Sequence, residues 1–310
     1  MKLRSGKQSY SHKYYNPSEV GSYSGLNRFN LKNVSKKKTA RYLSTQDVYT
    51  LHKPIVRRFQ RRKVICYGKF VTLEIDLIDL KNFSHSNSGN KYILTGICCF
   101  SRFGFAQPLR SKHAHSAISG LKKILQETKN RTKFISCDQG SEFISNSMKS
   151  FLDSKNIKLY HSYNKTIKAA LVERFNRTLQ TRLYKYMYAN KTKKYIHILQ
   201  DIVNSYNKTF HSSIGMSPNN VNDANSEIVW NKLYPFRYRK KHKFYIGDTV
   251  RIPSKHTIFT RGYTPNWQED IHTVVDIHNT TPYTYSLLNT SGNKVRKKYY
   301  EQEMVRVRYE

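Results

Sequence analysis

The sequence predicts an α/β domain with a mixed five-stranded sheet covered by helices, followed by a small all-β domain. Three observations support this prediction. Residues 71–80 alternate between apolar and polar positions, as a half-buried strand does. Residues 114–128 repeat apolar side chains at helical spacing. Beyond residue 244, short β-rich runs are separated by Gly and Pro, which is typical of a small barrel or sandwich.

The stretch before the predicted sheet is strongly basic. Residues 1–43 are rich in Ser, Tyr, Asn and Lys and show no hydrophobic period, so they are expected to form a flexible basic arm. Residues 44–67 are expected to begin with a short helix that Ser44 or Thr45 caps and Pro54 ends, because these residue types mark helix boundaries. The basic run "RRFQRRK" then serves as a linker.

The predicted α/β domain spans residues 68–225. Strand-like segments fall at 71–80, 91–100, 102–109, 133–137 and 157–161, and helical patterns at 114–128, 143–156, 169–189 and 193–210. The first three strands suit an antiparallel meander and the last two alternate with helices, which together predict a mixed sheet. A linker with the basic run "RYRKKHK" is expected over 226–243, and a small all-β barrel over 244–308.

The composition points to a polyanionic partner. The 310 residues include 55 Lys and Arg against 20 Asp and Glu, a formal net charge of +35. Such a charge favours nucleic acid, with an anionic membrane as the alternative. No membrane partner is expected, because the longest apolar run, in "YILTGICCF", is far shorter than the roughly 18 residues of a membrane-spanning helix. The four cysteines show no C-x-x-C spacing, which favours a reducing compartment, the nucleus or cytosol.

Three carboxylates fall at positions where α/β folds bind ligands. Asp76 lies on the first strand, Asp138 follows the fourth strand in "DQGSEF", and Glu173 begins a helix 35 positions later. Clustered carboxylates repel one another, and two divalent ions that prefer hard oxygen ligands, Mg²⁺ or Mn²⁺, would remove that cost. Such a metal pair promotes in-line displacement at phosphorus. Asp79 and Glu142 are expected outside this set, on the opposite face of the strand and beyond the turn.

Each acid also has an ordinary interpretation. Asp138 is a good turn or cap residue, Asp76 could face solvent, and Glu173 could form a salt bridge on a solvated helix. Helical spacing, however, places Glu173 away from the apolar stripe of its helix, among basic and amide residues. These neighbours, the second basic linker and one barrel arginine are the predicted DNA contacts: Lys165, Lys168, Arg174, Asn176, Arg177, Gln180, Arg237, Arg239, Lys240, Lys241, Lys243 and Arg251.

Residues 68–225 resemble the catalytic core of retroviral and transposon DDE integrases. The resemblance rests on the three acids together with the segments "KYILTGICCFSRFGFAQPL", "DQGSEF", "VERFNRTLQTRLY" and "YNKTFHSSIGMSPNNV". The integrases of Maverick/Polinton transposons and related virophages are nearer still, because they share segments similar to "QDVYTLHKP" and "GYTPNW".

This resemblance implies a ribonuclease-H-like fold in which Asp76, Asp138 and Glu173 are catalytic and hold two Mg²⁺ or Mn²⁺ ions, with a C-terminal DNA-binding barrel. It implies an integrase that acts on double-stranded DNA as a homo-oligomer, a dimer or tetramer, in the nucleus or, if virus-encoded, in a virion or viral factory. Two features depart from the family pattern. The aromatic residue often found just before the first aspartate is absent in "FVTLEID", and no His-His-Cys-Cys zinc module is present, since Cys66 is the first cysteine.

Two other functions remain open at this point. A ribonuclease-H-like nuclease would hydrolyse nucleic acid without joining strands, and it leaves the terminal barrel without a role. A non-catalytic DNA-binding protein derived from an integrase would tolerate loss of the acids, yet all three are present.

Overall fold

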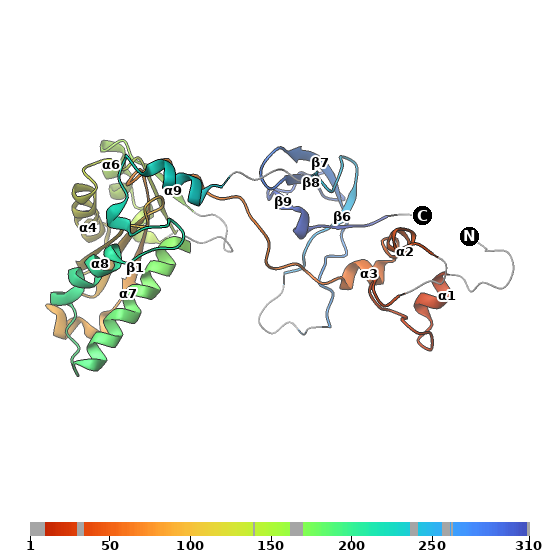
Figure 1. Ribbon diagram of the computed structural model, residues 1–310, viewed down its shortest axis with the longest axis horizontal. Coiled ribbons are helices and arrows are strands. Elements are labelled where there is room, and N and C mark those ends of the chain that lie inside the picture. Colours follow the sequence, from red (N-terminus) through yellow and green to blue (C-terminus); the bar gives the residue numbers. More distant parts are fainter. Residues whose placement is uncertain are drawn as a thin grey trace. The chain divides into compact units, whose positions relative to one another are not determined.

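A computed structural model describes residues 10–29, 34–138, 140–161, 170–235, 241–255, 261 and 263–308 (Figure 1). The chain forms two compact units. The core unit consists of Val64–Arg237, and the terminal unit combines Met1–Lys63 with Tyr238–Glu310. In the part of the chain that the structure describes, no helix has the length and apolar character needed to cross a membrane.

The core unit is built on a mixed sheet, as predicted. Its strands pair in the order β3-β2-β1-β4-β5. β1 pairs antiparallel with β2, and β2 with β3, whereas β4 runs parallel to both β1 and β5. The strands are β1 (Thr72–Asp79), β2 (Tyr92–Cys98), β3 (Gly104–Leu109), β4 (Phe134–Cys137) and β5 (Lys158–His161).

Helices cover both faces of this sheet (Figure 1). The alternation of β1 decides which side chains meet which layer. Leu73 and Ile75 pack with α4 (Ala114–Glu127) and α6 (Asn146–Ser154). Ile78 packs on the other side with the long helices α7 (Ala170–Ala189) and α8 (Leu199–Lys208). The polar side chains of β1 that alternate with Leu73 and Ile75 therefore face α7.

Short helices complete the connections of the core unit: η1 (Lys81–Asn87), α5 (Ser141–Ile144), η2 (Ile196–Ile198) and η3 (Pro218–Asn220).

A close approach between β3 and α7 fixes the helix against the sheet. A Cβ atom added to Gly104 would lie 2.5 Å from the ring of Phe175, so only glycine fits at this position. The side chain of Asn207 on α8 also binds both backbone groups of Gly104, accepting its N–H at 2.7 Å and donating to its carbonyl at 2.9 Å. Both long helices are thus locked onto β3, and α7 carries Glu173 in its first turn.

The core unit extends beyond the boundaries expected from the sequence. The predicted linker 226–243 begins with a helix, α9 (Ser226–Leu233), whose Val229 and Leu233 are buried in the hydrophobic core. At the other end of the unit, the hydroxyl of Tyr234 accepts a hydrogen bond from the backbone N–H of Cys66 at 2.9 Å. The linker expectation was wrong for residues 226–233. The following basic run suggested a linker, but the apolar Val229 and Leu233 pack into the core.

The terminal unit contains a five-stranded antiparallel sheet rather than a closed barrel. The strands pair in the order β10-β6-β7-β8-β9, and among the described residues β9 and β10 do not pair to close it. Its core includes Phe244, Val250, Val274, Tyr285 and Leu287. The elements are β6 (Thr249–Arg251), β7 (His272–His278), β8 (Thr284–Leu288), β9 (Tyr299–Tyr300), η4 (Glu301–Glu303) and β10 (Val305–Arg306).

The described part of the expected N-terminal arm is folded. It forms α1 (Tyr10–Tyr15) and α2 (Lys36–Leu43), and α3 (Asp47–His52) follows. Tyr14, Phe29 and Leu43 are buried together, with other tyrosines packed around them. The expectation of a flexible arm failed because aromatic rings, rather than a periodic aliphatic stripe, form this small core.

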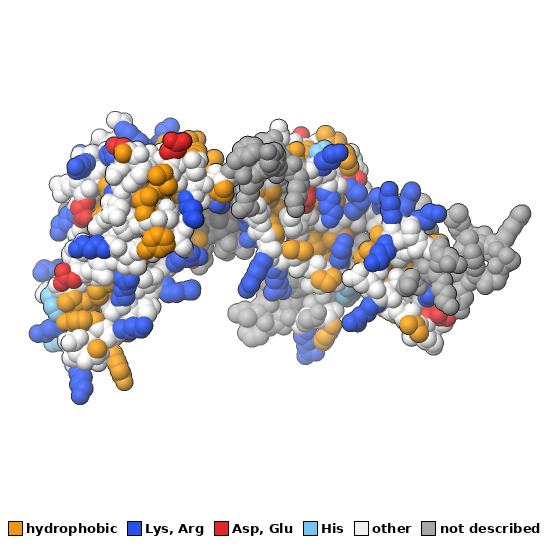
Figure 2. Space-filling model, in the orientation of Figure 1, with side chains coloured by type: hydrophobic (Ala, Val, Ile, Leu, Met, Phe, Trp, Pro, Cys, Tyr) orange, Lys and Arg blue, Asp and Glu red, His pale blue; other side chains and the backbone are white. Residues whose placement is uncertain are grey.

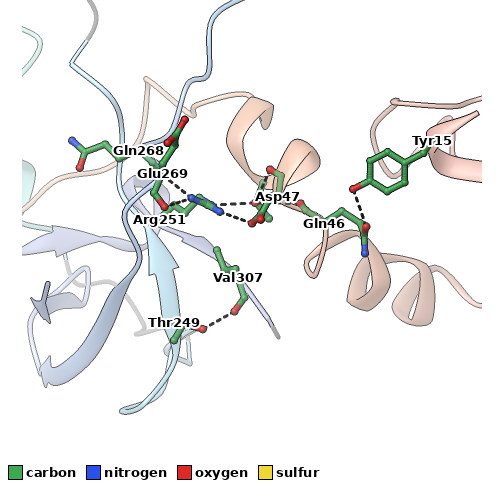
Figure 3. Close-up of polar contacts among 9 residues, drawn as sticks. Tyr15, Gln46, Asp47, Thr249, Arg251, Gln268, Glu269 and Val307 are labelled. Atoms are coloured by element: carbon green, nitrogen blue, oxygen red, sulfur yellow. Dashed lines mark hydrogen bonds and ion pairs between the residues drawn. The ribbon is translucent and has the colours of Figure 1, made fainter. Parts of the chain in front are cut away.

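The N-terminal helices and the C-terminal sheet form one body. Trp267 is buried, and its indole N–H donates to the carbonyl of Lys53 at 2.6 Å. Arg251 on β6 forms an ion pair with Asp47 on α3 at 2.5 Å (Figure 3). On the opposite side of α3, Tyr15 donates to the side chain of Gln46 at 3.0 Å.

Candidate active site

The fold brings the three predicted carboxylates into one region of the core unit. Asp76 lies in the middle of β1. Asp138 directly follows β4, which runs parallel to β1, and Glu173 stands in the first turn of α7. The negative charges of Asp138 and Glu173 both contribute to a raised pKa of Asp76, so the three groups interact electrostatically.

Asp76 is the most constrained of these acids. It is partly buried, and its Oδ1 accepts the backbone N–H of Leu77 at 2.8 Å. Its Oδ2 accepts the side-chain amide of Asn176 at 2.8 Å. Burial, together with the charges of nearby carboxylates, raises the pKa of Asp76 to about 6. The site therefore holds excess negative potential that a cation would relieve.

A fourth carboxylate, Glu142 on α5, also contributes to this potential. Its charge adds to the raised pKa of Asp76, and it helps to raise that of the buried Cys137 thiol to about 12, an effect caused mainly by burial. Glu142 was expected beyond the turn and outside the set; it does lie beyond the turn, on α5, but its charge still acts on Asp76. The turn at Gly140 folds the Glu142 carboxylate back, to 2.8 Å from where a Cβ of residue 140 would lie.

Asp138 and Asp79 have different surroundings. Asp138 is exposed, and its Oδ1 accepts the backbone N–H of Gly140 at 3.0 Å, which is the turn role that its position also suggests. Asp79 is exposed at the end of β1 and pairs with Lys81 at 2.9 Å, and hydrogen bonding to this lysine lowers its pKa. Asp79 therefore lies outside the carboxylate group, as expected.

The donor chemistry of the group fits a hard divalent cation. Carboxylate oxygens are the ligands that Mg²⁺ and Mn²⁺ prefer, and like-charge repulsion among them is the cost that such an ion removes. The Oδ1 atom of Asn176 is buried beside Asp76 without a hydrogen-bond partner. Within the described ranges, however, no three His, Cys, Asp or Glu side chains already converge on one metal position.

Glu74 lies two residues before Asp76, on the same face of β1. Its Oε2 accepts the backbone N–H groups of Leu171 at 3.0 Å and Val172 at 3.1 Å. Burial raises the pKa of Glu74, and the two amides oppose this effect. The signal available in the sequence was a second acidic residue on the Asp76 face of the strand.

The predicted DNA contacts differ in their exposure. Arg174 and Arg177 are exposed on α7 and Gln180 is half-buried there, while Lys241 and Lys243 are exposed in the terminal unit. Asn176 is 8% exposed and binds Asp76, so it orients a carboxylate rather than facing solvent. Five of the predicted contacts lie outside the described residues: Lys165, Lys168, Arg237, Arg239 and Lys240.

Arg251 is a structural residue rather than a DNA contact. Its side chain is buried, and besides the ion pair with Asp47 it donates to the Thr50 hydroxyl at 3.2 Å and to the Gln268 carbonyl at 3.0 Å (Figure 3). A further bond reaches the carbonyl of Glu269. The prediction was wrong because α3 and residues 268–269 cover the face of β6 that Arg251 occupies, and there its several donors join two parts of the unit.

Basic side chains are spread over the visible face of each unit, and acidic ones are sparse there (Figure 2). This distribution agrees with the net charge and leaves the carboxylate group as a local exception in a positive field.

Part of the core unit is similar in sequence to known proteins. Residues 72–165 match the integrase core domain. The integrase core match includes Asp76 and Asp138 and ends before Glu173. A transposon-derived protein of Caenorhabditis elegans is 31% identical over 195 residues, or 62% of this chain, and the chain spans 65% of the length of that relative. The chain is thus similar to integrase core domains over residues 72–165 and to a transposon-derived protein over a longer stretch.

Solved structures add a likeness in fold. A chain of the simian T-cell lymphotropic virus intasome, solved in complex with a PP2A regulatory subunit, is similar with a TM-score of 0.62 at 15% identity, covering 92% of this chain and 95% of that chain. The HTLV-2 integrase catalytic core domain in complex with magnesium gives a TM-score of 0.40 at 18% identity, covering 50% of this chain and 97% of that chain.

Proposed function

We propose that the protein is the integrase of a mobile DNA element. It would hydrolyse the 3′ ends of the element and then use the new 3′ hydroxyl to attack target DNA. The observation that carries this proposal is the electrostatic coupling of Asp76 to Asp138 and Glu173, which lie on β1, directly after β4 and on α7. The integrase core match over residues 72–165 includes the first two of these acids. The transposon-derived relative supports the mobile-element assignment.

Asp76, Asp138 and Glu173 would hold two Mg²⁺ or Mn²⁺ ions. When bound, such ions activate the attacking oxygen and stabilise the leaving oxygen in an in-line displacement at phosphorus. The protein's own part is positioning. Asn176 orients the Asp76 carboxylate through Oδ2, and the exposed guanidinium groups of Arg174 and Arg177 lie on the same helix as Glu173, where they can contact DNA phosphates.

The remaining parts of the proposal concern assembly and origin. The net charge of +35 favours double-stranded DNA as the partner. By analogy with the intasome chain that shares its fold, the active form would be a homo-oligomer, a dimer or tetramer. The segments "QDVYTLHKP" and "GYTPNW" favour a Maverick/Polinton-type or virophage-related integrase, which would act in the nucleus or, if virus-encoded, in a virion or viral factory.

A strand-transfer assay tests the proposal. The full chain is incubated with a labelled duplex carrying the element's own terminal sequence and with a supercoiled target plasmid, in Mg²⁺, in Mn²⁺ or in EDTA. Shortened ends and joined products are expected with either metal and neither is expected in EDTA. Cleavage without joining would instead support the ribonuclease-H-like nuclease, and binding without either reaction would support the non-catalytic DNA-binding protein.

A further inference from the structure

Glu74 connects β1 to the first turn of α7. Its Oε2 accepts two consecutive backbone N–H groups, from Leu171 and Val172. The first four N–H groups of an α-helix have no partner within the helix, so one carboxylate oxygen here satisfies two of them.

The position of this contact relates it directly to the carboxylate group. Glu74 is two residues from Asp76 on the same strand face, and Val172 directly precedes Glu173. The contact to Glu74 anchors the helix start to a central strand of the sheet. This contact therefore fixes the position of the backbone that carries Glu173 relative to the strand that carries Asp76.

Charge alone does not explain a glutamate at this position. Burial raises the pKa of Glu74; among nearby charges, that of Arg102 lowers this pKa and that of Glu173 raises it. Two acids at one helix start repel each other, and the positive end of the helix dipole offsets this repulsion. The two hydrogen bonds to Leu171 and Val172 offset the cost of burying the Glu74 carboxylate near another acid.

We propose that Glu74 is a positioning residue for Glu173, acting by reach rather than by charge: it clamps the first turn of α7 through the amides of Leu171 and Val172. The proposal rests on the proposed function only for its catalytic consequence. The clamp itself is a property of the metal-free, DNA-free protein.

Two conservative variants separate reach from charge. Glu74→Gln keeps an oxygen at the same distance from the backbone and removes the charge. Glu74→Asp keeps the charge and shortens the side chain by one methylene, so that it no longer spans the gap to the amides. Glu127→Asp is the matched control, because Glu127 lies at the end of α4 and its side chain accepts one hydrogen bond from Gln107 at 3.0 Å.

Amide hydrogen exchange of the full chain, without metal or DNA, is the first measurement. In Glu74→Asp, exchange at Leu171 and Val172 should be at least about tenfold faster than in the wild type. Glu74→Gln should stay within about threefold of the wild type, and Glu127→Asp should not change these amides. Unchanged protection in Glu74→Asp would refute the clamp.

Titration with Mn²⁺ alone is the second measurement. Glu74→Asp is expected to weaken Mn²⁺ binding by about tenfold. Glu74→Gln should largely preserve Mn²⁺ binding, because glutamine is as long as glutamate and its side-chain oxygen still reaches the two amides. The reverse order would show that Glu74 acts as a charged ligand and would overturn the positioning role. If the proposed function is wrong, the wild-type protein will join no DNA in the strand-transfer assay. The hydrogen-exchange result would still stand, because it is measured without metal or DNA.

Discussion

The side-chain amide of Asn176 on α7 donates a hydrogen bond to Oδ2 of Asp76 on β1 at 2.8 Å, across 100 positions of sequence. Glu173 lies three residues before Asn176, so the two share one face of the helix. The same helical face therefore supplies one carboxylate to the candidate site and orients another. This relationship makes α7 the element on which several tests of function depend.

Removal of any one of the three acids should abolish both reactions. Asp76→Asn, Asp138→Asn and Glu173→Gln preserve shape but remove one negative charge from the metal site. End hydrolysis and strand transfer should each fall by at least about 10³-fold, and a double variant should lose little more, because residues that act as a unit are non-additive. Rates measured on labelled terminal duplex check this.

Asp79→Asn is the matched control for these variants. Asp79 is exposed and paired with Lys81 at the end of the same strand, so this variant should keep substantial activity. Glu142→Gln should show an intermediate loss, since Glu142 contributes charge at the site. An active Asp138→Asn protein, or an Asp79→Asn protein as inactive as Asp76→Asn, would contradict the assignment.

The stability of the metal-free core unit should fall as pH rises from about 4 to about 6. The pKa of Asp76 is raised from 3.8 to about 6, so the folded protein binds this proton more tightly than the unfolded chain does. The resulting loss in unfolding free energy is about 1–3 kcal/mol. Urea unfolding in EDTA, followed by Trp230 in a Trp267→Phe background, measures it. Asp76→Asn should flatten this pH dependence, and Mg²⁺ should stabilise the wild type most at the high end of the range.

Arg251→Met should destabilise the terminal unit by about 2–4 kcal/mol, because it leaves the buried Thr50 hydroxyl and two carbonyls without a donor. Asp47→Asn should cost about 1 kcal/mol or less, since the Asp47 side chain is 72% exposed. Lys294→Met, which breaks a surface pair with Asp276, is the control. Thermal unfolding followed by Trp267 fluorescence in a Trp230→Phe background measures all three, and equal costs for Arg251→Met and Lys294→Met would contradict the buried role.

DNA affinity should fall steeply with salt and depend little on sequence, because the basic side chains contact mostly phosphates. Arg177→Gln should reduce the slope of log K against log salt by about one. Arg251→Met should leave the slope unchanged at a temperature where the protein stays folded, because its guanidinium is buried. Fluorescence anisotropy with a labelled duplex at several salt concentrations distinguishes the two.

A fragment of residues 64–237 should fold by itself, whereas 68–225 should be markedly less stable. The shorter fragment lacks Val229 and Leu233, which are buried in the core, and Tyr234, which binds the backbone of Cys66. Loss of these contacts should lower the melting temperature by several degrees or more, as circular dichroism can measure. The 64–237 fragment should also bind DNA more weakly than the full chain, since it lacks the basic terminal unit.

The sheet and the elements that carry the three acids could be predicted because they depend on local signals. Alternation along β1 separates Leu73 and Ile75 from Glu74 and Asp76, and the helices show an apolar stripe. Features that depend on contacts between distant segments could not be predicted. Glu142 acts on Asp76 through its charge from beyond the turn at Gly140, and no spacing rule predicts this effect.

The N-terminal segment shows the same limit in another form. Its composition is polar, so it was expected to stay unfolded, but Tyr and Phe rings bury enough surface to form a small core around Tyr14. Arg251 likewise appears as one more basic residue until the opposing α3 is in place, 204 positions earlier in the chain. Pairings over such distances leave no periodic trace in the sequence.

The terminal unit combines two segments that are far apart in the sequence, and this imposes an order on its folding during synthesis. On the ribosome, the N-terminal helices emerge before their partner strands and cannot meet them until synthesis has passed residue 238. The core unit lies between the two segments of the terminal unit in the sequence, so its sheet can form before the N-terminal helices meet their partner strands. Throughout translation, the surface of α3 that later binds Arg251 and Trp267 remains open to solvent and to chaperones. Closure of this long loop is then a late event, and mutations that slow it should lower the yield of native protein without changing the fold of the finished core unit.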